Sequence, residues 1–271
     1  MAQVWLVTGS SRGLGRAIVE AGLLAGNKVL ATARDIESLR ELSERYGDQV
    51  KLFELDVTDE SSAAGAVKTA IDAFGSLDVV INNAGYGNLS SVEDTPMSDF
   101  RAQIETNLFG TIIVTKAALP YFRERKAGHF VQFSSMGGRI GPPGRGPYSA
   151  AKWGVEGFSE VLSREVAPLG IKVTIIEPGG FRTDFAGSST KLSEGHPEYD
   201  STVGATARFQ RAYNGKQPGD PKKAALAIVR LTQEQLRLLL GSDAYNGAEK
   251  NDLARLEEAR AWKELSLSTD F

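Results

Sequence analysis

The sequence predicts an α/β fold in which a doubly wound parallel sheet of about seven strands carries helices on both faces. Three observations predict it: short apolar runs alternate with longer stretches of helical periodicity, a glycine-rich turn follows the first run, and the alternation resumes near the C-terminus. The 271 residues, of which 41% are hydrophobic, suffice for one large core. We therefore expect a single domain over residues 1–271.

The expected elements alternate along most of the chain. Apolar, β-rich runs predict strands over residues 3–8, 28–33, 50–55, 77–82, 130–134, 171–177 and 236–240. Helical spacing predicts helices over residues 13–25, 35–46, 60–74, 100–125, 148–168, 222–232 and 248–265. Asp35 is a candidate N-cap for the second helix, and the helix over residues 100–125 is expected to bend near Gly110.

Two segments near the C-terminus depart from this alternation. Residues 181–221 are rich in Ser, Gly and Pro, lack clear periodicity and carry the scattered aromatic residues Phe185, Tyr199, Phe209 and Tyr213. A long irregular segment in a compact domain is usually functional or disordered, so we interpret it as a substrate lid. Residues 243–271 are expected to contain a charged, amphipathic C-terminal helix.

Composition argues against several classes of function. The net charge of −3 and a pI near 5.6 offer nothing to attract nucleic acid or an anionic membrane. The absence of cysteine excludes disulfides and thiolate sites, and with two histidines we expect no metal site. His129 is expected on the surface and His196 in a solvated loop. The N-terminus lacks the pattern of a signal peptide, so we expect a cytoplasmic location.

The first glycine-rich turn is a candidate phosphate-binding site. Gly9, Gly13 and Gly15 stand between the first expected strand and the first expected helix. Glycines there let the backbone turn tightly and approach a dinucleotide pyrophosphate at a helix N-terminus. Their spacing differs from the standard Gly-x-Gly-x-x-Gly pattern, and a glycine-rich turn without a ligand is the alternative interpretation.

A tyrosine and a lysine on one helix form a candidate acid–base pair. Tyr148 and Lys152 are four residues apart and share one helix face. A lysine ammonium beside the phenol is expected to lower a pKa that is normally about 10. A phenol that exchanges a proton near neutral pH suits carbonyl/alcohol redox chemistry. We choose Ser135 over Ser134 as a further site residue because strand alternation puts it on the same face as Phe133.

Several ordered motifs together resemble the compact short-chain dehydrogenase/reductase family, most closely its ketoreductase and 17-beta-hydroxysteroid-dehydrogenase-like branch. The motifs that carry the resemblance run through most of the chain: the segment 8–15, Asp56, the segment 82–85, Asn107, Ser135, Tyr148 with Lys152, and Pro178-Gly179 with Thr183. The resemblance implies a Rossmann fold that binds NAD(P)(H) across the carboxyl ends of the strands.

The resemblance also implies roles for individual residues. Tyr148 would be the general acid or base, Lys152 would lower its pKa and bind the nicotinamide ribose, Ser135 would bind the substrate oxygen, and Asn107 would hold a water relay to Lys152. The cofactor-binding residues that it implies are Gly9, Ser11, Arg12, Gly13, Leu14, Gly15, Arg34, Asp56, Val57, Asn83, Ala84, Gly85, Tyr148, Lys152, Pro178, Gly179 and Thr183. Simpler interpretations remain for three of these residues: Asn107 could cap a helix, Asp56 could lead one, and Thr183 could only begin the lid.

Cofactor choice depends on the end of the second strand. NAD-selective relatives usually place an aspartate there, whereas this chain has Ala33 followed by Arg34. An arginine matches a 2′-phosphate, which a carboxylate would repel. We therefore predict NADP(H), with NAD(H) as the alternative if Asp35 rather than Arg34 meets the ribose.

The predicted function is an NADPH-dependent reduction of a ketone or aldehyde to an alcohol, a reversible reaction at CH–OH/C=O groups. The scattered lid aromatics favour an apolar, bulky small-molecule carbonyl substrate. The alternatives are a dinucleotide-binding sensor without turnover and an epimerase or dehydratase. The sequence leaves a homodimer or a homotetramer open as the assembly.

Overall fold

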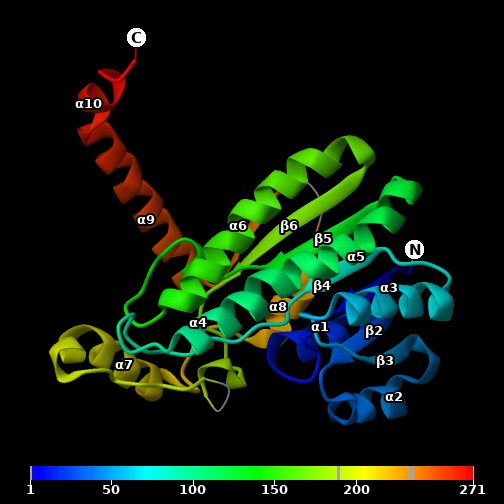
Figure 1. The fold of residues 1–271 in the computed structure, drawn as a ribbon. Helices are drawn as coiled ribbons and strands as arrows, with labels where there is room; N and C mark the ends of the chain where they lie inside the picture. The colour runs from blue at the N-terminus through cyan, green and yellow to red at the C-terminus, as the bar shows by residue number, and fades with distance from the viewer. Residues whose placement is uncertain (1, 188–189, 232–234, 271) are drawn as a thin grey trace.

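A seven-stranded parallel sheet forms the centre of the protein, as the alternating pattern predicts (Figure 1). The computed structural model describes residues 2–187, 190–231 and 235–270. The strands lie in the order β3-β2-β1-β4-β5-β6-β7. Their bounds are Val4–Val7 for β1, Lys28–Ala33 for β2, Val50–Glu54 for β3, Val79–Asn82 for β4, Gly128–Phe133 for β5, Ile171–Pro178 for β6 and Arg237–Leu240 for β7.

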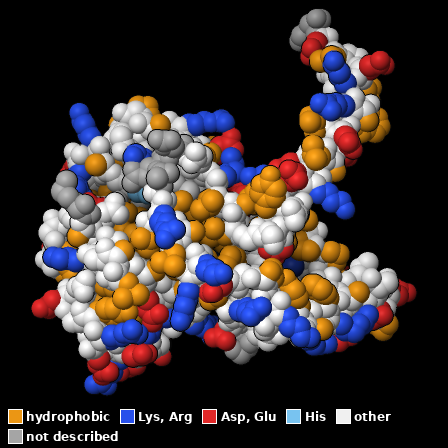
Figure 2. All heavy atoms as spheres, turned by 180° about the vertical axis from the view of Figure 1, so that it is seen from behind, with side chains coloured by type: hydrophobic (Ala, Val, Ile, Leu, Met, Phe, Trp, Pro, Cys, Tyr) orange, Lys and Arg blue, Asp and Glu red, His pale blue; other side chains and the backbone are white. Residues whose placement is uncertain are grey.

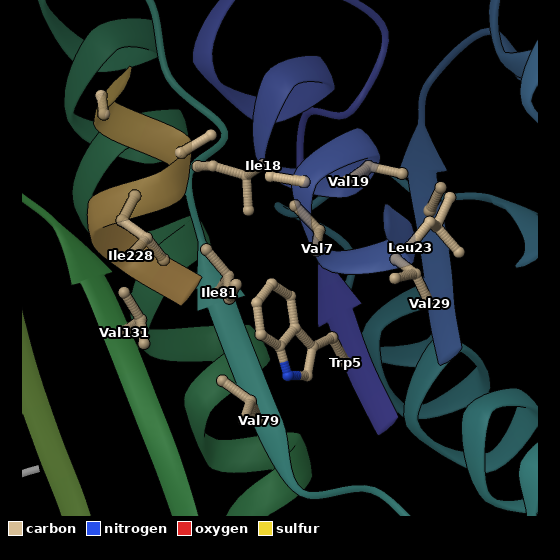
Figure 3. Packing of buried hydrophobic residues seen from close by; sticks show 14 of the residues in the cluster. Trp5, Val7, Ile18, Val19, Leu23, Val29, Val79, Ile81, Val131 and Ile228 are labelled. Carbon is tan, nitrogen blue, oxygen red and sulfur yellow. The ribbon is translucent and has the colours of Figure 1, made fainter. Parts of the chain in front are cut away.

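Helices cover both faces of the sheet and divide the core into two layers. The helices are α1 (Gly13–Leu24), α2 (Arg40–Tyr46), α3 (Glu60–Phe74), α4 (Met97–Ile104), α5 (Gly110–Arg125), α6 (Gly146–Val166), α7 (Ala205–Tyr213), α8 (Pro221–Val229), α9 (Ser242–Ala261) and α10 (Lys263–Leu267). On one face, Trp5 of β1 packs among residues of α1 and α8 such as Ile18 and Ile228 (Figure 3). On the other, α3, α5 and α6 cover Leu6 and Phe130. Both layers exclude water from the strands, which explains their nearly continuous apolar sequences.

The strand order reverses beside β1. The chain runs from β1 to β2 and β3 on one side, then crosses to β4, which pairs with the other edge of β1. In doubly wound sheets, such a reversal opens a crevice at the carboxyl ends of the strands. The glycine turn after β1 and the segment 83–85 after β4 therefore lie at this crevice.

The segment predicted as one helix over residues 100–125 is interrupted. A π-helical turn, Glu105–Phe109, separates α4 from α5, and it precedes the expected bend at Gly110. Asn107 in this turn is fully buried and binds the neighbouring backbone through its side chain. A wider turn that aims one side chain inward is typical of π-helical insertions at functional sites.

One histidine prediction is wrong. His129 is 5% exposed, because β5 begins at Gly128 and therefore includes this residue as part of the sheet. Its Nε2 lies 2.9 Å from the Thr174 hydroxyl. Burial, with the Lys172 charge adding to the effect, lowers the pKa of His129 to about 4. His196 is exposed, as predicted.

The lid and the C-terminal region contain more helix than the sequence suggests. Within residues 181–221 the described chain forms α7, two short 3-10 turns and a π-helical turn, although residues 188–189 of the predicted lid lie outside the described residues. The predicted helix over residues 222–232 is α8, whose predicted last residue is likewise not described. The C-terminal helix begins at Ser242, earlier than residue 248, because its first two turns pack into the body and bury Ala244 and Ala248.

Helices α9 and α10 form an arm that stands clear of the body (Figures 1 and 2). Leu253, Leu256, Trp262 and Leu265 are 57%, 47%, 59% and 62% exposed on it. Across the described ranges, the helices lack the length and continuous apolar character that a bilayer crossing requires.

Candidate active site

The turn between β1 and α1 has the shape that its glycines predict. Gly9 and Gly13 have φ angles of +68° and +59°, in the left-handed region that favours glycine. A Cβ on Gly15 would lie 2.1 Å from the Gly9 carbonyl oxygen, and one on Gly13 would lie 3.4 Å from the Thr183 Cβ. Among the described residues, no side chain caps the N-terminus of α1. The backbone therefore comes close to this helix end and leaves its first N–H groups for an anion.

Side chains from two strands hold the glycine turn in place. Asn83, after β4, donates from Nδ2 to the carbonyl oxygens of Thr8 and Gly9 at 3.0 and 3.2 Å. The Thr8 hydroxyl oxygen accepts from the backbone N–H groups of Asn83 and Ala84, both at 3.0 Å. These bonds join the two strands at the reversal point, so the turn is shaped before any ligand arrives.

A cavity of about 680 Å³ follows the carboxyl edge of the sheet. It brings together the predicted site residues except Asn107, which lies behind its wall. The predicted residues that line it are Gly9, Ser11, Arg12, Gly13, Leu14, Gly15, Arg34, Asp56, Val57, Asn83, Ala84, Gly85, Ser135, Tyr148, Lys152, Pro178, Gly179 and Thr183. The glycine turn and the Tyr148–Lys152 pair thus belong to one continuous site, large enough for a dinucleotide and a small substrate.

The end of β2 lies beside the cavity, where its residues bear on the choice between NADP(H) and NAD(H). The strand ends at Ala33, and Arg34 lines the cavity with an exposed side chain that pairs with no carboxylate of the described residues. Asp35 is outside the cavity lining and caps the next 3-10 turn, where its carboxylate accepts a backbone N–H at 3.1 Å. Asp56 lines the cavity and accepts from the Thr58 N–H and hydroxyl at 2.9 and 2.7 Å, whereas Asp59, not Asp56, caps the helix that follows.

Helix α6 and the end of β5 bring the proposed catalytic side chains together. Tyr148 lies in the first turn of α6 and Lys152 one turn later, on the same face. The Lys152 ammonium is buried and donates to the Phe133 carbonyl oxygen at 2.7 Å, and the Ser135 side chain lies close enough to Tyr148 to act on the pKa of its phenol. Ser135 also accepts the Gly137 N–H at 3.0 Å, which fixes its direction.

The electrostatics of the tyrosine differ from the prediction. Burial raises the pKa of Tyr148 above its usual value, while the hydrogen bond with Ser135 and the charge of Arg145 act in the opposite direction. Burial also lowers the pKa of Lys152 to about 8, against the opposing influence of Glu156. The Lys152 ammonium, 5.8 Å from the Tyr148 ring centroid, therefore does not hold the tyrosine pKa below its usual range.

Asn107 supports the site from behind. Its Oδ1 accepts the Tyr86 N–H at 2.9 Å, and its Nδ2 donates to the Tyr86 carbonyl oxygen at 2.8 Å. A Cβ on Gly85 would lie 2.6 Å from Asn107 Oδ1 and 3.6 Å from Lys152 Nζ. Asn107 thus fixes the loop beside the lysine and does not cap a helix. Its predicted water relay stays a prediction.

The lid covers the substrate end with aromatic side chains. The Phe185 ring lies 5.6 Å from the Tyr148 ring, centroid to centroid. Phe209 and Tyr213 of α7 stack at 4.9 Å, and both line the cavity. Tyr199 lies outside the lining and donates its hydroxyl to Glu93 at 2.7 Å.

Comparison with known proteins agrees with this geometry. The family model described as short chain dehydrogenase matches residues 3–193. The chain belongs to the short chain dehydrogenase family. Its members are oxidoreductases, so the fold and the enzyme class predicted from the motifs are confirmed.

Three similar proteins match the short chain dehydrogenase over most or all of its length. Oxidoreductase BOA17 of Botryotinia fuckeliana is 48% identical over 99% of this chain and 100% of its own. The crystal structure of a short-chain dehydrogenase from Streptomyces avermitilis is 41% identical, covers 100% of both chains and superposes with a TM-score of 0.92. ElxO, solved with NADP bound, is 25% identical, covers 91% of this chain and 100% of its own, and gives a TM-score of 0.75.

Sequence reasoning about this short chain dehydrogenase missed several polar residues that line the cavity, and four of them come from distant segments. Arg145 lies at the N-terminus of α6, Gln210 in α7, Gln217 at the end of the lid and Asp243 at the start of α9. They share no short motif.

Proposed function

We propose that this short chain dehydrogenase is an NADP(H)-dependent oxidoreductase that reduces a ketone or aldehyde to an alcohol in a reversible reaction. The observation that carries the proposal is that Tyr148, Ser135 and Lys152 line the same cavity as the glycine turn. The NADP bound to the related ElxO supports the choice of cofactor.

The residues of the cavity fit a dinucleotide phosphate. The glycine turn and the uncapped N-terminus of α1 would bind the pyrophosphate, and the Arg12 and Arg34 cations would meet a 2′-phosphate. Lys152 and Thr183 also line the cavity, and the nicotinamide would lie beside them. Bound there, the cofactor would supply the hydride that reduces the carbonyl carbon.

Side chains of the protein would donate and accept the proton of the reaction. Tyr148 would donate its phenolic proton to the carbonyl oxygen, and Ser135 would donate a hydrogen bond to the same oxygen as negative charge develops on it. Lys152, with a pKa of about 8, can exchange a proton near neutral pH and would help to reprotonate the tyrosine. In the reverse direction, the same phenol would accept the alcohol proton.

A direct assay separates this function from its alternatives. The purified protein is mixed with NADPH and a panel of ketones and aldehydes, and the fall in NADPH absorbance is followed. We expect turnover with part of the panel. Tight NADPH binding without turnover on any member would instead identify a dinucleotide sensor, and loss of the carbonyl without oxidation of NADPH would indicate an epimerase or dehydratase.

Two further predictions accompany this function. A homodimer or homotetramer would cover the exposed leucines of the arm, Leu253, Leu256 and Leu265. Light scattering of the purified protein would contradict it by giving a monomer mass. A cytoplasmic location likewise stays a prediction.

A further inference from the structure

Arg145 places a cation at the substrate end of the cavity. The residue precedes α6 and lies three positions before Tyr148. Its Nη1 donates to the Gly87 carbonyl oxygen at 2.9 Å, and its Nη2 donates to Oε1 of Gln210 on the lid helix α7. Its Cζ lies 6.0 Å from the Tyr148 ring centroid. A substrate whose carbonyl oxygen reaches Tyr148 therefore lies within reach of this guanidinium.

The charge of Arg145 lacks a carboxylate partner among the described residues. Its acceptors are the neutral oxygens of Gly87, Asn88 and Gln210, and burial lowers its pKa. Other partly buried arginines are paired: Arg139 contacts Glu177 and Asp252, Arg237 contacts Glu156 and Glu160, and Arg125 contacts Asp78. A desolvated cation without an anion is costly, so Arg145 is arranged for an anion that the protein itself does not supply.

Donors without acceptors face the same cavity. The guanidinium has five N–H groups, and Nε–H and the second Nη2–H of Arg145 have no acceptor in the described ranges. The Nε and Nη2 groups form the edge that binds a carboxylate with two parallel hydrogen bonds. Gln210 is 8% exposed and its Nε2 is unpaired, and Gln217, at 1%, lacks partners for both amide atoms. Buried amides without partners are rare unless a ligand or water completes them.

We propose that the substrate is an oxo acid, whose carboxylate is bound by Arg145 and Gln210 while its carbonyl oxygen lies at Tyr148 and Ser135. This inference rests on the proposed function and names its substrate class. The lid aromatics Phe185 and Phe209 would pack against the carbon chain between the two ends. An apolar carbonyl compound, favoured by the aromatics alone, would leave the Arg145 cation buried and unneutralised.

The test compares two substrates that share the ketone and differ at the carboxylate, which in one is charged and in the other is a neutral methyl ester. Levulinate and its methyl ester share the ketone, so the ratio of their kcat/KM values measures what the carboxylate contributes. We expect the acid to be preferred, and Arg145→Met to reduce the acid-to-ester ratio by about 10- to 150-fold, the usual contribution of a charged hydrogen bond. Arg145→Lys, which keeps the charge but not the paired donors, should keep part of the preference.

The ratio excludes indirect effects. Any effect of Arg145 on the Tyr148 pKa, on the lid or on folding changes both substrates alike and cancels. An equal loss of acid and ester turnover in Arg145→Met, or no preference for the acid in the wild type, would overturn the inference while leaving the proposed function intact.

A binding measurement separates the two proposals. Pentanoate, which has no ketone, is titrated calorimetrically into the NADPH-loaded wild type and Arg145→Met, with pentanamide as the neutral control. We expect pentanoate to bind the wild type only. Binding of this kind without turnover of any member of the ketone and aldehyde panel would retain the anion site and reject the reductase. Turnover of the ester without pentanoate binding would reject the anion site alone.

Discussion

Polar groups at the amino end of the parallel sheet have partners, whereas several at its carboxyl end have none among the described residues. At the amino end, Asp78 accepts the Val4 N–H at 2.8 Å and pairs with Arg125 at 3.0 Å, and His129 contacts Thr174. At the carboxyl end, Gln210, Gln217 and Asp243 have polar atoms without partners in the described part of the chain. These three residues line the cavity. The first arrangement stabilises the fold, whereas the second leaves groups available to a ligand.

The comparison predicts that substitutions at the two ends affect different properties of the protein. Changes at the carboxyl end should alter chemistry and binding more than the free energy of unfolding. Changes at the amino end should alter stability and leave the chemistry intact. Enzymes commonly show this division, because a site built for ligands retains polar groups that the fold alone would bury in pairs.

The largest expected effect is at Tyr148. Tyr148→Phe removes only the hydroxyl that would transfer the proton, so we expect turnover to fall by 10²–10⁴-fold, about 3–5 kcal/mol in activation free energy, with NADPH affinity nearly unchanged. Steady-state kinetics and a fluorescence titration of NADPH measure the two effects.

A second tyrosine gives a matched control. The Tyr46 hydroxyl, at the end of α2, is buried without a hydrogen-bond partner among the described residues. Tyr46→Phe therefore removes the same atom away from the cavity and should leave turnover unchanged. Equal losses in the two variants, or substantial turnover in a folded Tyr148→Phe protein, would remove Tyr148 from its proposed role.

The regular part of the fold could be predicted because its signals are local. Each strand is a short apolar run and each flanking helix carries an apolar stripe, so periodicity located every strand within a few residues. The turn at Gly9 and Gly13 could be located for the same reason, since a tight turn with positive φ favours glycine at neighbouring positions of the sequence.

The rest depended on contacts between distant segments. His129 is buried because β5 pairs with β6 at Lys172, and the sequence around His129 does not reveal that pairing. The pKa of Tyr148 reflects burial beneath a lid more than thirty residues away, and Arg145 meets Gln210 across 65 positions. A local pattern cannot report such contacts, which is why the acid–base pair was found and its electrostatics were predicted wrongly.

At the amino end, His129 should make stability depend on pH. Its folded-state pKa of about 4 lies below the unfolded value near 6.5, so only the unfolded chain gains a proton between these values. The stabilisation is complete above pH 6.5 and is lost as the pH falls toward 4, by roughly 3 kcal/mol in total. Burial also raises the pKa of Glu177 to about 7, so protonation of this carboxyl on acidification opposes the loss in the wild type. Urea unfolding at pH 7.5 and pH 5 therefore measures the His129 share, about 2 kcal/mol, as the difference between the wild type and a variant without this histidine.

The chain has two histidines, which provide a test variant and a matched control, and the Glu177 contribution is common to both. His129→Gln keeps a polar group for Thr174 and should remove most of the loss between the two pH values. His196→Gln, at an exposed lid position, should leave the loss as in the wild type. A wild-type pH dependence that persists in His129→Gln would assign it to other groups.

The smallest expected effect sharpens the comparison within the carboxyl end, at the cofactor's 2′-position. Arg34 lines the cavity, and one charge-assisted contact to a phosphate contributes about 1.5–3 kcal/mol, a preference of about 10- to 150-fold. We expect NADPH to exceed NADH in kcat/KM by at least tenfold. Replacing Ala33 with Asp and Arg34 with Leu should reverse the order, because the guanidinium is lost and a carboxylate acceptor for the 2′-hydroxyl is gained.

Asp35→Asn is the control: its carboxylate caps a turn outside the cavity lining, so the ratio of the two kcat/KM values should stay unchanged. A ratio that shifts in Asp35→Asn but not in the double variant would show that the Asp35 carboxylate, and not Arg34, meets the ribose.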